Sequence, residues 1–261
     1  MFSMIKAETK RMFKSRSFWV SLLIFSAVFS LCVLTQSSGQ NANDFTVNDD
    51  AFQFGLYIAV DRMLTTLDSL VISFGATFAM LIMGIYLSSF SSQEYTSGYI
   101  KNIATIQNGR RNSCIAKGFI AVLTAIILIS VSYLLSFLLG KSLILHFTID
   151  STMHIIQTAF SLTLLSISSY SMIICISIVL RSKVAGIIAA FMIASGMLLP
   201  LIEKLLQIFN MTSLLEYTLS YQYAHLPAFD PAHADSMIIV SLFYFAIYNI
   251  ITVLIVKKRD I

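Results

Sequence analysis

The sequence predicts an all-α membrane protein, a polytopic helical bundle with six transmembrane helices. Of its 261 residues, 57% are hydrophobic and only 11% are charged, which leaves too little polar surface to coat a soluble domain of this length. Several apolar runs exceed the roughly 18 residues that a helix needs to cross about 30 Å of hydrocarbon. The alternating pattern of an outer-membrane barrel is absent. We therefore expect a single transmembrane domain over residues 1–261, with the lipid bilayer as its surroundings.

Residues 2–16 predict a short amphipathic elbow helix at the membrane surface. Its apolar side chains fall within an arc of about 100° when the segment is drawn as a helix. On the other side lie Arg11 and three lysines, Lys6, Lys10 and Lys14, which repeat every four residues. These three lysines lie on one side of the helix and repel one another, so an anionic surface is expected opposite them. Lipid headgroups alone, or lipid together with acidic residues of a partner, satisfy this requirement.

Six apolar segments after the elbow are expected to cross the membrane. The first begins with Phe18 and Trp19, aromatic residues of the kind that settle at headgroup level. The fifth carries Gly186, Ala190 and Ala194 four residues apart, a face for close helix packing that we place inside the subunit in preference to a dimer seam. The predicted spans cover about residues 17–35, 68–90, 114–139, 155–180, 184–200 and 236–256.

Two of the segments between the spans have interpretable patterns. Residues 91–113 form a polar loop in which a short helix is expected at about 93–105. Pro200 interrupts the apolar run of the fifth span, and the pieces that follow it are too short to cross. Residues 201–235 are therefore interpreted as an extracellular re-entrant hairpin and loop, whose backbone must be satisfied by protein or by a water-filled cavity.

The distribution of basic residues predicts the orientation of the bundle. If the N-terminus is cytoplasmic, 14 of the 17 Lys and Arg residues fall on the cytoplasmic side, and only Arg62, Lys141 and Lys204 fall outside. Cytoplasmic loops carry such an excess of Lys and Arg. Both termini are therefore expected in the cytoplasm. The net charge of +4 follows from this orientation and does not indicate a nucleic-acid partner.

Motifs for catalysis or metal binding are not found. Residues 140–142 spell Gly-Lys-Ser, the tail of a phosphate-binding loop, but Leu135 stands where that motif requires glycine. His225 and His233 lie near aspartates, yet their spacing matches no helical pair of metal ligands. Zinc-protease and serine-hydrolase motifs are also missing. We predict no catalytic residue, no metal site and no cofactor site in this chain.

Transport is the function class that remains, and the placement of charge bears on its energy source. Carriers coupled to protons or sodium need ionisable groups within the bilayer. Apart from residues at their ends, the six predicted spans contain no Asp, Glu, Lys or Arg. Only Glu203, Lys204 and Glu216 of the hairpin remain as candidates for such coupling, and the simpler explanation is that their long side chains reach the interface. Uphill transport would therefore take its energy from another chain.

The polar loop after the second span resembles that of type-2 ATP-binding-cassette (ABC-2) exporter permeases. Glu94 and Gly98 are spaced as in the family's E-x-x-x-G-T motif, although Tyr99 stands where threonine is common. The order of elbow helix, six spans and broken hairpin is also similar to the family's, and the size resembles that of bacterial peptide-export and lantibiotic-immunity permeases. Basic residues follow the motif as in the family: Lys101, Arg110, Arg111 and Lys117.

The resemblance implies a permease subunit in the cytoplasmic membrane of a bacterium. ATP and Mg would be bound by a separate ABC ATPase subunit, and a second permease, identical or different, would complete a dimer. The exported substrate would be amphipathic, such as a peptide or an antibiotic. A membrane-embedded sensor or scaffold that recruits a cytoplasmic partner through residues 91–113, without transport, is the alternative.

The resemblance also assigns roles to residues of the loop. Its helix would be the coupling element that sits in a groove of the ATPase, and Gly98 would permit close approach. Glu94 would pair with a basic group, either on the ATPase or on the elbow helix, where Lys6, Lys10 and Lys14 are the candidates. An ordinary exposed acid near a helix N-terminus is the other interpretation of Glu94.

Overall fold

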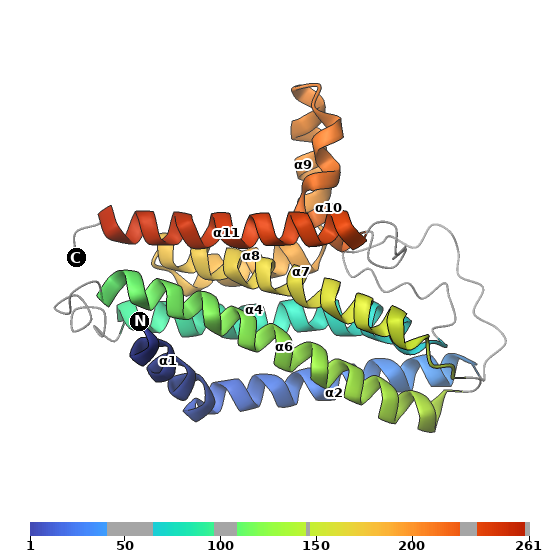
Figure 1. Cartoon of the computed structure of the whole chain (residues 1–261). Helices are drawn as coiled ribbons and strands as arrows, with labels where there is room; N and C mark the ends of the chain where they lie inside the picture. The colour runs from blue at the N-terminus through green and yellow to red at the C-terminus, as the bar shows by residue number, and fades with distance from the viewer. Residues whose placement is uncertain (41–64, 97–108, 145–146, 225–233, 259–261) are drawn as a thin grey trace.

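The computed structural model describes residues 1–40, 65–96, 109–144, 147–224 and 234–258, and its regular elements are all helices (Figure 1). The predicted all-α bundle is confirmed. Among these residues five helical segments are long and apolar enough to cross a membrane. They are α2 (Arg16–Gln40), the continuous α3 (Leu67–Leu70), π-helical η1 (Val71–Ala76) and α4 (Thr77–Thr96), then α6 (Gly109–Leu143), α7 (Thr152–Val179) and α11 (Ala234–Lys258).

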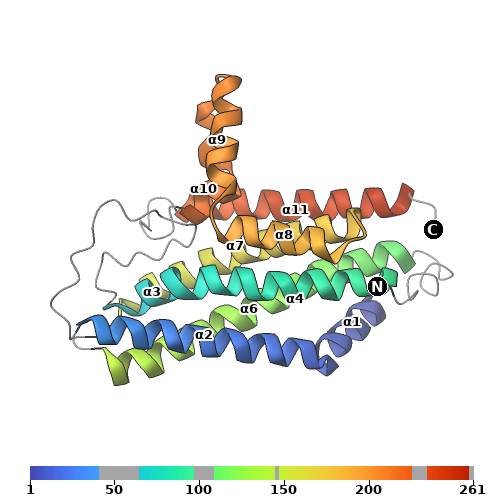
Figure 2. The same cartoon turned by 180° about the vertical axis from the view of Figure 1, so that it is seen from behind.

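Helices α4 and α7 form the centre of the bundle. Helix α4 packs against α2, α7 and α8 (Lys183–Ala194), whereas α7 packs against α6, α8 and α11. The start of α1 and the end of α11 lie at one end of the bundle, here named the terminal end, and α3 lies at the opposite or far end (Figures 1 and 2). The outer helices expose large apolar side chains such as Leu23 and Phe243, which suits contact with lipid.

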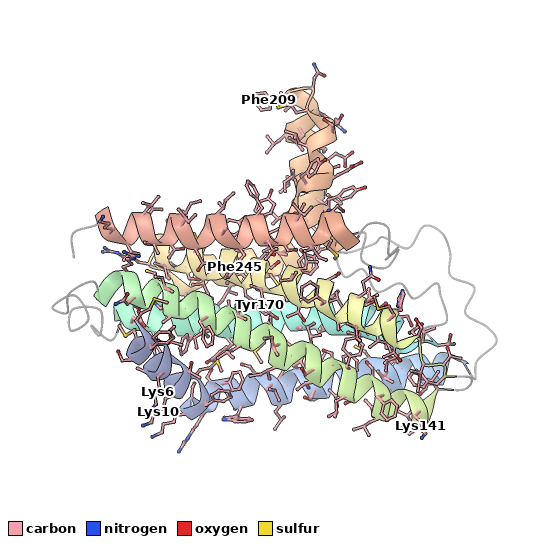
Figure 3. The ribbon with its side chains drawn as sticks, in the orientation of Figure 1. Lys6, Lys10, Lys141, Tyr170, Phe209 and Phe245 are labelled. Atoms are coloured by element: carbon pink, nitrogen blue, oxygen red, sulfur yellow. The ribbon has the colours of Figure 1, made fainter. Side chains whose placement is uncertain are left out.

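The elbow helix α1 (Phe2–Lys14) lies across the terminal end and joins α2 through Ser15. The indole Nε1 of Trp19 donates a hydrogen bond to the Phe13 carbonyl, 2.9 Å away, and so fixes this corner. Met12 is fully buried because α1 packs against α6. The lysines Lys6, Lys10 and Lys14 are all exposed, and Figure 3 shows the first two pointing away from the bundle.

Small residues allow α8 to approach the centre of the bundle closely. Gly186, Ala190 and Ala194 are buried on the face of α8 that meets α4 and α7. A Cβ placed on Gly84 of α4 would lie only 2.6 Å from the Cβ of Ala190. A side chain at Gly186 would collide with the Ser177 hydroxyl. The small-residue ladder therefore lies inside the subunit.

The fifth span differs from the predicted 184–200 helix. Helix α8 ends at Ala194, and Gly196 takes a positive φ of 67° that a side chain would disfavour. Its 12 residues extend about 18 Å, which covers only part of the hydrocarbon. The break comes before Pro200, which lies in the first turn of the next helix, where proline's missing N–H costs no helical hydrogen bond.

A hairpin leaves the bundle after this break. Helix α9 (Leu198–Ile208) bends 83° away from α8, and η2 (Thr212–Tyr217) and α10 (Leu219–Ala224) return the chain to α11. Figures 1 and 2 show the hairpin standing nearly perpendicular to the helix axes, with Phe209 at its tip in Figure 3. No residue of α9 is buried.

Candidate functional site

Four ionisable side chains from three helices meet at the terminal end of the bundle. Glu94 lies in the last turn of α4, Lys117 near the start of α6, and Glu8 and Arg11 one turn apart on α1. Here they are named the Glu94 cluster. Since the elbow and the two spans are distant in sequence, this cluster is a tertiary contact that connects the three helices.

The carboxylate of Glu94 accepts a hydrogen bond from a cation at each of its oxygens. Arg11 Nη1 donates to Oε1 at 2.8 Å, and Lys117 Nζ donates to Oε2 at 2.5 Å. The Ser113 hydroxyl adds a longer bond to Oε2, at 3.4 Å. The side chains of Glu94 and Lys117 are only 1% and 3% exposed, whereas Arg11 is 28% exposed. The charges are therefore largely removed from water and rely on one another.

Arg11 fastens the elbow helix to α4 through a second contact. Its Nη2 donates to the Phe90 carbonyl at 2.9 Å, and its guanidinium lies 4.3 Å from the centre of the Phe90 ring. An arginine suits this place because its planar fork of donors serves a carboxylate, a carbonyl and an aromatic face together. A lysine has one compact charge and cannot make all three contacts.

Glu8 is the second acid of the cluster, and the pKa of its carboxyl is raised. Burial and the neighbouring charge of Glu94 raise the pKa of Glu8 from 4.5 to about 7, although Arg11 and Lys117 oppose the shift. The carboxyl is only 1% exposed, so little water reaches it. Protonated Glu8 can donate to Glu94, which leaves Glu94 as the anion that both cations share.

The structure brings together only some of the predicted site residues. Glu94 pairs with the elbow helix, but through Arg11, and the predicted candidates Lys6, Lys10 and Lys14 are exposed instead. The physical reason is helix rotation: the face of α1 that packs on the bundle carries Glu8, Arg11 and Met12. The lysines lie on the opposite, exposed face.

The remaining predicted residues have different outcomes. Arg111 is exposed at the start of α6, and Arg110 also belongs to that helix. Gly98, Lys101 and most of the predicted 93–105 helix lie outside the described residues, as do His225 and His233; its first residues, 93–96, continue α4.

Lys117 is the site residue whose position the sequence did not show. Its position in the sequence groups it with the polar loop, but it lies inside α6 and is buried. The expectation that charges stop at the ends of the spans is therefore wrong at Lys117, whereas the buried Asp68 lies at the start of its span, where the sequence predicts it. The available signal was a lysine followed directly by a long apolar run, since a charge within such a run needs a partner.

One comparison with known proteins is informative. The sequence profile of a family described as ABC-2 family transporter protein matches residues 4–196. The matched region includes almost all of the elbow helix and all four residues of the Glu94 cluster. No curated protein matches the chain.

Removing one member of the buried pair should destabilise the fold strongly. Glu94→Gln leaves Lys117 buried without its main counter-charge. Lys117→Met removes one of the two cations that pair with the buried Glu94 carboxylate. We expect each change to lower the free energy of unfolding by about 3–5 kcal/mol, whereas the double variant should lose much less than the sum. Reversible unfolding of the purified chain in mixed micelles measures this coupling. Glu203→Gln on the exposed α9 is the matched control and should change little; additive losses in the double variant would contradict the pairing.

Stability should depend on pH through Glu8. Its folded pKa of about 7 lies above the unfolded value of 4.5, so folding favours the bound proton. The resulting stabilisation is complete below about pH 4.5 and is lost as the pH rises through about 7. Glu8→Gln imitates the protonated acid, and we expect it to be more stable than wild type at pH 8 but similar at low pH. Thermal unfolding at both pH values measures the difference, and a variant no more stable than wild type at pH 8 would refute it.

Proposed function

This chain belongs to the ABC-2 family of transporter proteins and is a membrane permease component of an ABC transporter; from this we propose that it is an exporter permease driven by ATP hydrolysis on a separate ATPase subunit. A second permease, identical or different, completes the transporter. The proposed substrate is amphipathic, such as a peptide or an antibiotic.

The observation that carries the proposal is the position of the Glu94 cluster. Glu94 lies two residues before the end of α4, where residues 97–108 begin. Its carboxylate also holds α1 through Arg11 and α6 through Lys117. A force applied by an ATPase to the segment between α4 and α6 would therefore act on three helices at once. We propose that α1, α4 and α6 move as one unit.

The burial of the polar side chains inside the subunit supports a substrate route along its outer surface. The hydroxyl-rich α7 lies at the centre of the bundle, and its Thr158, Ser161 and Ser168 are fully buried. These three hydroxyls therefore form no polar face that is open to a substrate. Large exposed apolar side chains lie on the outer surface of the bundle, among others on α2, α6 and α11, so we propose that an amphipathic substrate passes along the outer surface, where two permeases meet.

The charge of the two ends supports the proposed orientation in a bacterial cytoplasmic membrane. The exposed side chains at the terminal end include several cations, among them Lys6, Arg111 and Lys183. The far end carries the acids Asp68 and Asp150. Because Lys and Arg are in excess on the cytoplasmic side of membrane proteins, we propose that the terminal end, and with it both termini, lies in the cytoplasm.

The coupling role is tested by releasing the elbow without disturbing the buried pair. Arg11→Gln removes the link between α1 and α4 but leaves Glu94 bonded to Lys117. In the complex with its ATPase, reconstituted in lipid, we expect substrate-stimulated ATP hydrolysis to fall about fivefold or more, since the coupling of distant sites is typically of this size. Basal hydrolysis should persist.

Lys10→Gln is the matched control, because it removes the same charge from an exposed position one residue away. It should retain stimulated hydrolysis. Undiminished stimulation in Arg11→Gln would refute the coupling role of the Glu94 cluster. Failure of any ATPase to copurify with the chain would favour the sensor or scaffold instead.

A further inference from the structure

A second cluster of ionisable side chains lies at the far end of the bundle. Asp68 of α3, Asp150 just before α7 and His154 in the first turn of α7 each offer one ligand atom, and these atoms lie within 4.8 Å of one another. The cluster is separate from the Glu94 cluster at the terminal end, and transport by the proposed mechanism does not use it.

The backbone holds these three residues in place. Residues 65–67 and Thr148 pair in a short parallel bridge, in which Leu67 N donates to the Thr148 carbonyl at 3.2 Å and Thr148 N donates to the Thr65 carbonyl at 2.9 Å. The backbone N–H of Asp68 then donates to the Asp150 carboxylate at 3.0 Å. The ligand atoms are thus positioned by the fold before any ion binds.

The charge of the cluster is unbalanced. Asp68 is only 2% exposed, and its carboxylate accepts a hydrogen bond from the Tyr133 hydroxyl at 2.8 Å. Its other oxygen lies 2.6 Å from Nδ1 of His154. Within the described ranges, no lysine or arginine forms an ion pair with Asp68. Of the described residues in this cluster, two are carboxylates and one is an imidazole, and burying a carboxylate is costly without a positive charge.

We propose that Asp68, Asp150 and His154 bind a divalent transition-metal ion, with Zn²⁺ as the best match. One imidazole nitrogen and two carboxylate oxygens are the donor types that zinc accepts, and three protein ligands leave a fourth position for water. Calcium and magnesium prefer sites made of oxygen alone. The ion replaces the proton between His154 and Asp68, and Tyr133 orients the Asp68 carboxylate from behind.

The ion would act as a clamp between two membrane-spanning segments. Asp68 stands at the start of the second span, whereas Asp150 and His154 stand at the start of α7. Zinc would join these two starts at the far end, in addition to the short bridge and the hydrogen bonds between them. Its binding is therefore expected to stabilise the fold even without an ATPase or a substrate.

The test uses the purified full-length chain in lipid nanodiscs after treatment with a chelator, with zinc chloride alone as the probe. We expect micromolar zinc to bind by calorimetry and to raise the thermal unfolding temperature by several degrees. Asp150→Asn and His154→Gln should each weaken zinc binding about tenfold or more. Because both residues are only partly buried, the variants are expected to fold without zinc.

The control is the double variant His225→Gln and His233→Gln, which removes two of the chain's four histidines and leaves the proposed ligands intact. It should keep the full zinc response. The proposal would be overturned if the wild-type chain did not bind zinc, or if calcium stabilised it equally. It would also be overturned if zinc binding survived in both Asp150→Asn and His154→Gln.

Discussion

A carboxylate that is almost completely withdrawn from water organises the terminal end of this bundle. Glu94 is tolerated there because two cations from two other helices satisfy its oxygens, and Lys117 is tolerated inside α6 for the same reason. Neither charge is stable alone in that environment. The arrangement therefore specifies how the elbow, the second span and the third span fit together, and a shift of any one helix would separate a buried ion pair.

The rest of the bundle depends on close approach of backbones at its centre. Gly84 and Gly186 let α8 pack tightly against α4 and α7, and the Ser88 hydroxyl adds a 2.6 Å hydrogen bond to the Lys183 carbonyl at the start of α8. Helix α4 thus connects the Glu94 cluster, the centre of the bundle and, through η1 and α3, the far end. A displacement that begins at the terminal end, which we propose faces the ATPase, has a continuous helical path along this segment to the far end.

Long apolar runs made the helical class and the long helices predictable, and the E-x-x-x-G pattern singled out Glu94. Features that depend on tertiary packing were not predictable. Periodicity alone does not show which face of α1 meets the bundle, so Arg11 was not identified as the partner. The sequence predicts the break in the fifth span at Pro200. The chain instead turns at Gly196, which takes a positive φ. Asp68 and His154 are 86 positions apart, and no local pattern joins them.

The central claim is that α1 and α4 move together when ATP is bound, because Arg11 ties them to one carboxylate. The most direct measurement is the distance between spin labels on Lys10 and Gln93, two exposed positions on α1 and α4, after the three cysteines have been replaced. We predict the same distance distribution for the complex without nucleotide and with ATP trapped. A shift between the two states that exceeds the width of the distribution would show that the helices separate, and would contradict the claim.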